Sequence, residues 1–118
     1  MDRGAHEPRL SIRLHFADGA MLGPGKANLL SAIATTGSIA AAGRSMGMSY
    51  KRAWYLVETL NGYFGAPLVQ ASKGGRSGGS AILTTLGQEV LAAYRDVEHA
   101  ARVAAGPGVA RLHSLRHP

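Results

Sequence analysis

The stretch from Gly37 to Phe64 constrains the fold of this chain more than any other, and it reads GSIAAAGRSMGMSYKRAWYLVETLNGYF. It predicts two short helices around a tight turn at Gly47, because glycine adopts the positive φ that a larger side chain resists. Small residues at positions 41–43 allow the two helices to cross closely. Ser49 stands at the N-cap position of the second helix, where its hydroxyl accepts a hydrogen bond from a free backbone N–H.

The second of these helices has an apolar stripe and a polar, basic start. The stripe recurs at the helical spacing of 3.6 residues. Its members are Ala53, Val57, Leu60 and Phe64. The first turn carries Tyr50, Lys51 and Arg52. A basic first turn on a helix that is anchored by an apolar stripe is typical of the recognition helix of a helix-turn-helix, which enters the major groove of DNA.

The charge of the chain is concentrated in its middle. The net charge is +6 over 118 residues, a length that predicts one domain. Between Pro24 and Gln88 the only acidic residue is Glu58. The basic residues of that segment are Lys26, Arg44, Lys51, Arg52, Lys73 and Arg76. A basic middle indicates a polyanionic partner, most often nucleic acid, although a merely solvated basic surface is the alternative.

The residues before the helical pair predict a strand, a turn and a further helix. Residues 1–8 are expected to be flexible. Residues 9–17 (RLSIRLHFA) alternate between apolar and polar, the pattern of a half-buried strand. Asp18-Gly19 is a turn signal, and residues 20–22 form a short return strand. Pro24 then begins a helix over residues 25–36, because the first helical turn does not need its missing N–H. Gly37 is predicted to end this helix as a C′ glycine, and Ser38 to cap the next one.

The residues after the helical pair predict a wing and a long final helix. We use the word wing for two strands, residues 67–72 and 81–84, and the glycine-rich basic tip KGGRSGGS between them. The final helix is predicted from about Thr85 to about Ala104, and residues 105–118 are predicted to be a disordered basic tail. The expected fold is therefore mainly α (α+β): a winged helix-turn-helix domain over residues 9–104, with an N-terminal strand or hairpin and a C-terminal dimerisation helix.

Two segments resemble the N-terminal winged helix-turn-helix domain of ModE-type molybdate-responsive transcription regulators. They lie within about residues 26–91 and read LLSAIATTGSIAAAGRSMGMSYKRAWYLVETLN and PLVQASKGGRSGGSAILTTLGQEVL. LysR-type regulators share a looser form of this pattern. Full-length ModE-type regulators continue into two small β-barrel modules that bind molybdate, and the residues after Ala105 do not resemble such modules. The resemblance therefore implies DNA binding and dimerisation, and we do not extend it to molybdate sensing.

A DNA-binding surface is predicted on the second helix of the pair and on the wing. Lys51 or Arg52 can bind guanine O6 and N7, which gives about 1–3 kcal/mol of discrimination for each good pair. The wing cations neutralise phosphates, and their glycine neighbours let backbone N–H groups approach the DNA. The predicted DNA-binding residues are Arg44, Ser49, Tyr50, Lys51, Arg52, Tyr55, Lys73 and Arg76.

Three features of this surface have alternative interpretations. Ser49 acts only as a helix cap, or it also contacts a phosphate. Trp54 packs in the core or stacks on a base; we favour packing, because duplex DNA offers no unstacked base. The wing tip is alternatively a hairpin without contacts, or the phosphate loop of a nucleotide enzyme. The last option lacks the GxxxxGK[ST] pattern and joins two strands rather than a strand and a helix.

The predicted final helix, residues 85–104, carries an apolar stripe longer than one small core requires. The stripe consists of Leu86, Val90, Leu91, Tyr94, Val97 and Ala101. We expect it to pack on a second subunit, which would place two recognition helices one DNA turn, about 34 Å, apart. The alternative is that the stripe only closes the core of the monomer.

Other chemistry has little support in the sequence. The absence of cysteine excludes disulfides, thiolate metal sites and cysteine nucleophiles. The histidines show no paired ligand spacing, and no nucleophile motif is present, so we expect neither an enzyme nor a cofactor. The N-terminus has no signal-peptide core, and a cytoplasmic protein is expected. Two alternatives to a homodimeric, sequence-specific regulator remain: a module that forms heterodimers with a full-length regulator, and a small oxyanion (molybdate) sensor.

Overall fold

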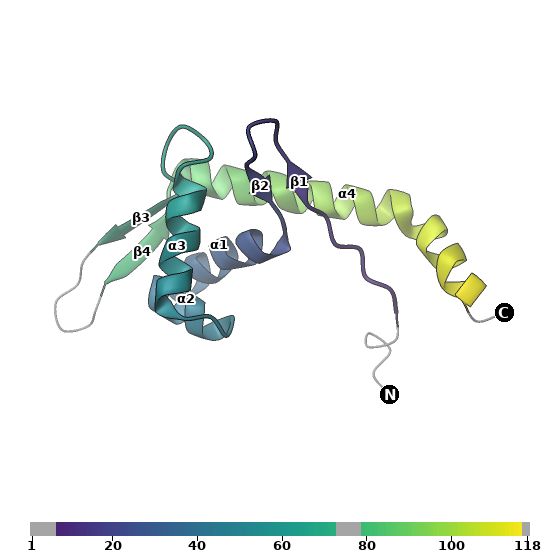
Figure 1. Cartoon of the computed structure of the whole chain (residues 1–118), viewed down its shortest axis with the longest axis horizontal. Coiled ribbons are helices and arrows are strands. Elements are labelled where there is room, and N and C mark those ends of the chain that lie inside the picture. Colours follow the sequence, from purple (N-terminus) through teal and green to yellow (C-terminus); the bar gives the residue numbers. More distant parts are fainter. Residues whose placement is uncertain (1–6, 73–78, 117–118) are drawn as a thin grey trace.

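The computed structural model describes residues 7–72 and 79–116 of the chain. Helices α1 to α3 form a compact body, the β3–β4 hairpin extends from one end of it, and α4 runs past the body and beyond (Figure 1). The elements in order are β1 (Leu14–His15), β2 (Met21–Leu22), α1 (Pro24–Thr36), α2 (Ile39–Ser45), α3 (Tyr50–Asn61), β3 (Val69–Ser72), β4 (Ser80–Leu83) and α4 (Thr85–Arg116). The predicted mainly α winged helix-turn-helix is confirmed.

Local hydrogen bonds fix the ends of the first three helices where the sequence predicts them. Gly37 ends α1 in the left-handed conformation with φ 71°, and its N–H donates to the Ile33 carbonyl. The Ser38 hydroxyl caps α2 by accepting from the Ala41 N–H at 3.1 Å. Gly47 turns the chain into α3 with φ 69°. The Ser49 hydroxyl then accepts from the Arg52 N–H at 3.0 Å, which confirms its role as the N-cap of α3.

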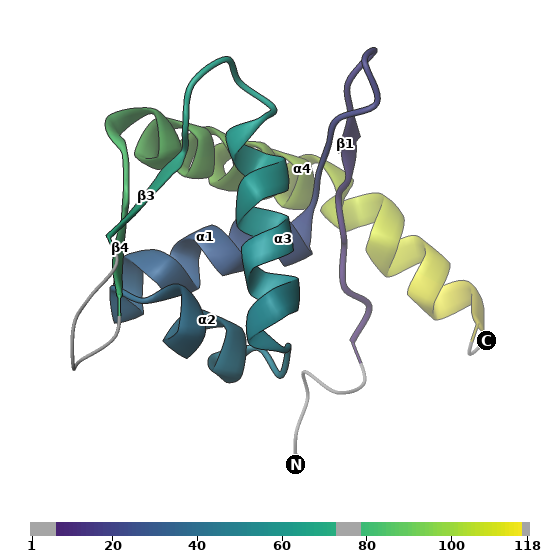
Figure 2. The ribbon, with the colours of Figure 1, turned by 60° about the vertical axis from the view of Figure 1, so that its left-hand side comes forward.

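One hydrophobic core joins the helical body, the wing strands and the start of α4. Its largest fully buried side chains are Leu29, Leu30, Ile33, Val57, Leu60, Leu68 and Tyr94. The predicted close crossing of α2 and α3 occurs at Gly43, where an added Cβ would lie 3.0 Å from the Ala53 Cβ. The packing of these elements leaves the first turn of α3 at one edge of the body (Figure 2).

The N-terminal strand is much shorter than predicted. Only residues 14–15 are strand, and they pair antiparallel with β2 in the register Leu14↔Leu22. The preceding segment is extended but pairs with no strand among the described residues; its Ile12 carbonyl accepts a hydrogen bond from the Tyr94 hydroxyl at 2.7 Å. The alternation in residues 9–17 therefore reflects packing along the helices as well as strand pairing. The predicted return hairpin is confirmed, with a positive φ at Gly19.

Helix α4 corrects the predictions for the C-terminus. It does not end near residue 104, and residues 105–116 are helical rather than disordered. Pro107 lies inside the helix and removes one backbone hydrogen bond. Val103, four residues earlier, is exposed, so water can bond to the carbonyl that the proline leaves free. The C-terminal third of α4 bends away from the line of the helix (Figure 1), for which a proline is the usual cause. None of the helices in the described part of the chain is long and apolar enough to cross a membrane.

Candidate nucleic-acid interface

The first turn of α3 presents its side chains to solvent. Ser49, Tyr50, Lys51 and Arg52 are all exposed. On the other face of the helix, Ala53 and Val57 are buried, with at most 1% of their surface exposed. The apolar stripe therefore fixes the helix on the body, and the polar turn projects from a rigid support.

Arg52 is held against a tyrosine on the next turn. Its guanidinium carbon lies 5.5 Å from the centre of the Tyr55 ring, in cation–π contact. Tyr55 itself is 59% exposed, so the pair forms part of the molecular surface. A guanidinium that lies over a ring loses less conformational freedom on binding than a free one, which favours a planar, two-bonded contact.

The aromatic residues beside the turn divide between the surface and the core. Tyr50 is 58% exposed and packs edge to face with Trp54 at 6.2 Å between ring centres. Trp54 is half-buried and packs against the hydrophobic core, which confirms the favoured interpretation of this residue. The Ser49 oxygen accepts the capping bond, and its own O–H is still available as a donor.

The cations of the chain's middle do not lie on one surface. Arg44 is exposed in the last turn of α2, next to the turn that leads to α3. Lys26, by contrast, lies 5.8 Å from the centre of the Tyr63 ring, beyond the other end of α3. Helix α3 has 12 residues, about 18 Å of length, so Lys26 is remote from the first turn.

Strands β3 and β4 form the predicted wing. They pair antiparallel from Val69↔Leu83 to Ser72↔Ser80. Lys73 and Arg76, the predicted phosphate contacts, lie outside the described residues. At the base of the wing, the Asn61 side chain bonds to the main chain of β3, and nothing in the sequence pattern had indicated it.

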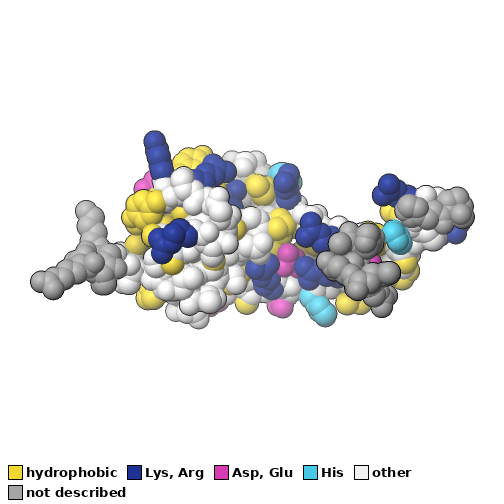
Figure 3. All heavy atoms as spheres, turned by 90° about the horizontal axis from the view of Figure 1, so that it is seen from below, with side chains coloured by type: hydrophobic (Ala, Val, Ile, Leu, Met, Phe, Trp, Pro, Cys, Tyr) yellow, Lys and Arg dark blue, Asp and Glu magenta, His cyan; other side chains and the backbone are white. Residues whose placement is uncertain are grey.

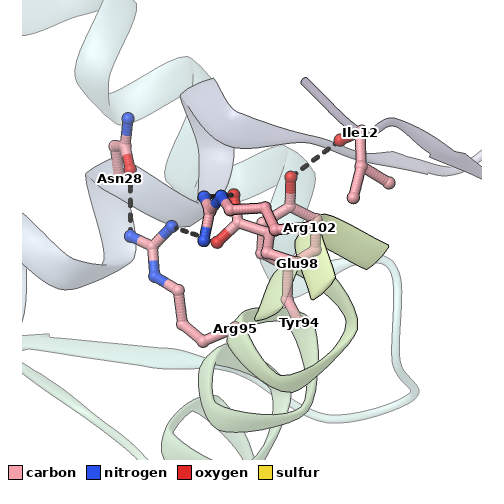
Figure 4. Close-up of polar contacts among 6 residues, drawn as sticks. All are labelled: Ile12, Asn28, Tyr94, Arg95, Glu98 and Arg102. Carbon is pink, nitrogen blue, oxygen red and sulfur yellow. Dashed lines mark hydrogen bonds and ion pairs between the residues drawn. The ribbon is translucent and has the colours of Figure 1, made fainter. Parts of the chain in front are cut away.

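A second polar cluster lies on α4, on the side of the N-terminal segment (Figure 4). Glu98 is 6% exposed, and its carboxylate pairs with Arg95 at 2.9 Å and with Arg102 at 3.7 Å. Arg95 also donates to the Asn28 side chain of α1 at 2.9 Å. Burial, and secondly the Glu98 charge, raise the pKa of the Tyr94 phenol, so it stays protonated as a donor to Ile12. These bonds tie α4 to α1 and to the N-terminal segment.

Lys and Arg side chains predominate over acidic ones on the face seen in Figure 3. They continue from the body to the C-terminal end of α4, where no acidic residue follows Glu98. The arrangement offers an exposed, cation-bearing helix end on the body, an adjacent wing, and a basic distal helix. No group of three or more His, Asp or Glu side chains that could hold a metal ion occurs within the residues described.

Comparison with known proteins identifies relatives of this domain. The family model for bacterial regulatory helix-turn-helix proteins of the lysR family matches residues 26–88. The molybdenum-pterin-binding protein MopB of Rhodobacter capsulatus is 45% identical over 96 residues, which are 81% of this chain and 33% of that protein. The DNA-binding transcriptional dual regulator ModE of Escherichia coli (strain K12) is 38% identical over 79 residues, 67% of this chain and 28% of that protein. The chain thus spans about a third of the length of these relatives.

A solved structure has the same fold. The structure described as the crystal structure of the CbnR_DBD–DNA complex matches with a TM-score of 0.57, over 75% of this chain and 95% of that one. The two sequences are 20% identical, so this match concerns the fold alone. It agrees with the arrangement of helices and wing described above.

Proposed function

Because the chain belongs to the bacterial regulatory helix-turn-helix proteins of the lysR family, we propose that it is a transcription regulator that binds double-stranded DNA in a sequence-specific manner as a homodimer. One observation carries the proposal: the exposed polar and basic first turn of α3, on a helix whose opposite face is buried. The name of one relative supports it, since ModE of Escherichia coli is described as a DNA-binding transcriptional dual regulator.

Selection of bound sequences from a random pool of duplex DNA tests this function. The expected result is an enriched palindrome, because two symmetric subunits read two equivalent half-sites. Enrichment of a single, non-repeated motif would argue against the dimer alone. A folded protein that retains no duplex at low ionic strength would end the proposal.

The proposed contacts divide into base readout and phosphate binding. The first turn of α3 enters the major groove, where Arg52 or Lys51 binds guanine and Tyr50 and Tyr55 contact the adjacent edge. Phosphates are held by Arg44, Ser49 and the wing-tip cations Lys73 and Arg76. The supporting observations are the exposure of the α3 residues and of Arg44 and the cation–π contact of Arg52 with Tyr55.

Substitution of one residue from each group separates the two roles. Arg52→Ala is expected to cost about 1–3 kcal/mol on the preferred site and to relax preference at particular base pairs. Lys73→Ala is expected to weaken binding to all sequences alike, because a phosphate contact carries no sequence information. Affinities for the selected site and for single-base variants of it measure both effects. Equal, sequence-blind losses from the two substitutions would contradict this division.

Helix α4 is the proposed dimer contact, but the residues that form it differ from most of the predicted stripe. Leu86, Val90 and Leu91 pack against the monomer core, and Tyr94 is buried within it. The apolar side chains that remain exposed lie further along, at Val97, Val103, Leu112 and Leu115. A helix end that leaves the body is marginal in water without a partner. A second α4 would cover Val97, Leu112 and Leu115, which share one face of the helix at the 3.6-residue spacing.

Charges favour an antiparallel arrangement of the two helices. The first half of α4 carries the exposed acids Glu89 and Asp96. The second half carries Arg102, Arg111 and Arg116 and no acid after Glu98. Antiparallel pairing places the basic half of one helix beside the acidic half of the other, whereas parallel pairing places like charges together.

Val97→Glu tests the dimer. Val97 is 40% exposed at the middle of α4, and a carboxylate at this position would lose its hydration when the apolar interface closes. Sedimentation velocity is expected to show monomers at concentrations where the unsubstituted chain is dimeric. Gln88→Glu adds the same group at an exposed position near the start of the same helix and should leave the dimer intact. Dissociation of both variants, or of neither, would contradict the assigned contact.

A further inference from the structure

We propose that Asn61 positions the wing relative to the recognition helix, so that both reach the same DNA duplex together. The inference rests on the proposed function, because it concerns the same interface. Asn61 is the last residue of α3, and its side chain points to the main chain at the start of β3. It is not expected to touch DNA itself.

The Asn61 amide makes three hydrogen bonds to the base of the wing. Its Oδ1 accepts from the Leu68 N–H at 2.8 Å and from the Val69 N–H at 3.0 Å. Its Nδ2 donates to the Val69 carbonyl at 3.2 Å. The side chain therefore pairs with Val69 as the main chain of a neighbouring strand would.

The main-chain groups that bond to Asn61 are buried, so water cannot readily replace its side chain. Leu68 is fully buried, and Val69 is 3% exposed. Their N–H groups have little access to water, so loss of the Asn61 oxygen leaves buried donors unsatisfied. An aspartate would keep the two accepted bonds, but it has no donor for the Val69 carbonyl and would set two oxygens against each other.

Among the described residues, the other hydrogen bonds at the base of the wing do not involve α3. The Thr84 hydroxyl donates to the Pro67 carbonyl at 2.8 Å, next to the start of α4. The Ala81 N–H donates to the Gly37 carbonyl at 2.8 Å, at the end of α1. Within the described ranges, the three Asn61 bonds are the hydrogen bonds that join α3 to the wing strands. These three bonds therefore help to set the angle between the recognition helix and the wing, together with the hydrophobic core that both share.

A fixed angle matters because two surfaces of one subunit must bind the same duplex. When the wing is already oriented, it loses little further conformational entropy in contacting DNA once α3 has entered the groove. When the link is lost, the wing must be ordered during binding, and part of its contribution disappears. The effect of Asn61 on affinity should then pass through the wing.

A double-mutant cycle with the full chain tests this coupling. Fluorescence anisotropy with the selected duplex gives the dissociation constants of four proteins: unsubstituted, Asn61→Ala, the wing-tip variant Lys73→Ala with Arg76→Ala, and the combined variant. Asn61→Ala is expected to weaken binding on the order of tenfold when the wing tip is intact. In the wing-tip variant the same substitution should change affinity by less than about twofold. Equal losses in the two backgrounds would overturn the proposal.

Two further variants serve as a matched control and as a substitute if Asn61→Ala does not fold. Asn28→Ala removes another side-chain amide that joins two elements, through its bond with Arg95, but it is remote from the wing. It should change affinity by less than about twofold in both backgrounds. If Asn61→Ala does not fold, Asn61→Asp should give a smaller loss with the same dependence on the wing tip. Failure of the unsubstituted chain to bind duplex DNA would refute the proposed function; binding with additive losses would refute only the role of Asn61.

Discussion

Replacing Gly87 with alanine is expected to destabilise the fold by about 3 kcal/mol, at the upper end of the usual cost of overpacking. Gly87 lies in the first turn of α4, where an added Cβ would overlap the Leu68 carbonyl oxygen and lie 3.0 Å from the carbonyl carbon. The Leu68 backbone cannot retreat easily. Its carbonyl accepts from the Thr84 N–H at 2.9 Å, and its N–H donates to Asn61.

Urea denaturation of Gly87→Ala and of Gly108→Ala measures this effect with a matched control. Gly108 lies in the same helix, and beyond its own neighbouring helix turns nothing lies within 4 Å of an added Cβ there. Alanine is a better helix former than glycine by about 1 kcal/mol, so Gly108→Ala should stabilise the protein or leave it unchanged. The same substitution is thus expected to destabilise the protein at one position of the helix and not at the other. A Gly87→Ala protein as stable as the unsubstituted chain would contradict the close contact.

The affinity for DNA is expected to fall about 10⁴-fold between 50 and 200 mM salt. The estimate assumes about four phosphate contacts in each subunit of a dimer, which gives a slope near −7 for log affinity against log salt concentration. Electrophoretic mobility shift or anisotropy titrations at several salt concentrations measure the slope directly.

Two variants test whether this slope comes from the proposed phosphate contacts and from two subunits. Removing one phosphate-binding side chain, as in Lys73→Ala, should make it shallower by about 1 for each subunit. A monomeric Val97→Glu protein should show about half the slope, because half of the contacts remain. A nearly flat dependence would refute the electrostatic part of the proposed interface, even if binding itself were observed.

The sequence predicted those elements that depend on local chemistry. Ser38 and Ser49 were recognised as caps because a hydroxyl before a helix satisfies free N–H groups within three residues. Gly37 and Gly47 were recognised as turns because they require positive φ. The apolar stripe of α3 followed from the spacing of Ala53, Val57 and Leu60, and it determined which face of α3 is exposed. Phe64, the predicted fourth member, lies beyond the end of the helix at Asn61.

Features that depend on contacts between distant residues were not predictable. A proline such as Pro107 normally ends a helix, but here it lies inside α4 at an exposed position, where water can bond to the carbonyl that it leaves free. The alternation of residues 9–17 resembled a strand, but Ile12 is held by Tyr94, which lies 82 positions away. Asn61 was inconspicuous because its partners lie beyond a loop whose path the sequence does not specify.

The position of Trp54 has a practical consequence. It is the chain's sole tryptophan, half-buried and in edge contact with Tyr50 on the first turn of α3. Its indole emission reports on the polarity and ring contacts of its immediate neighbourhood. Engagement of Tyr50 by a ligand therefore changes an intrinsic optical signal, and titrations can be followed with unlabelled protein.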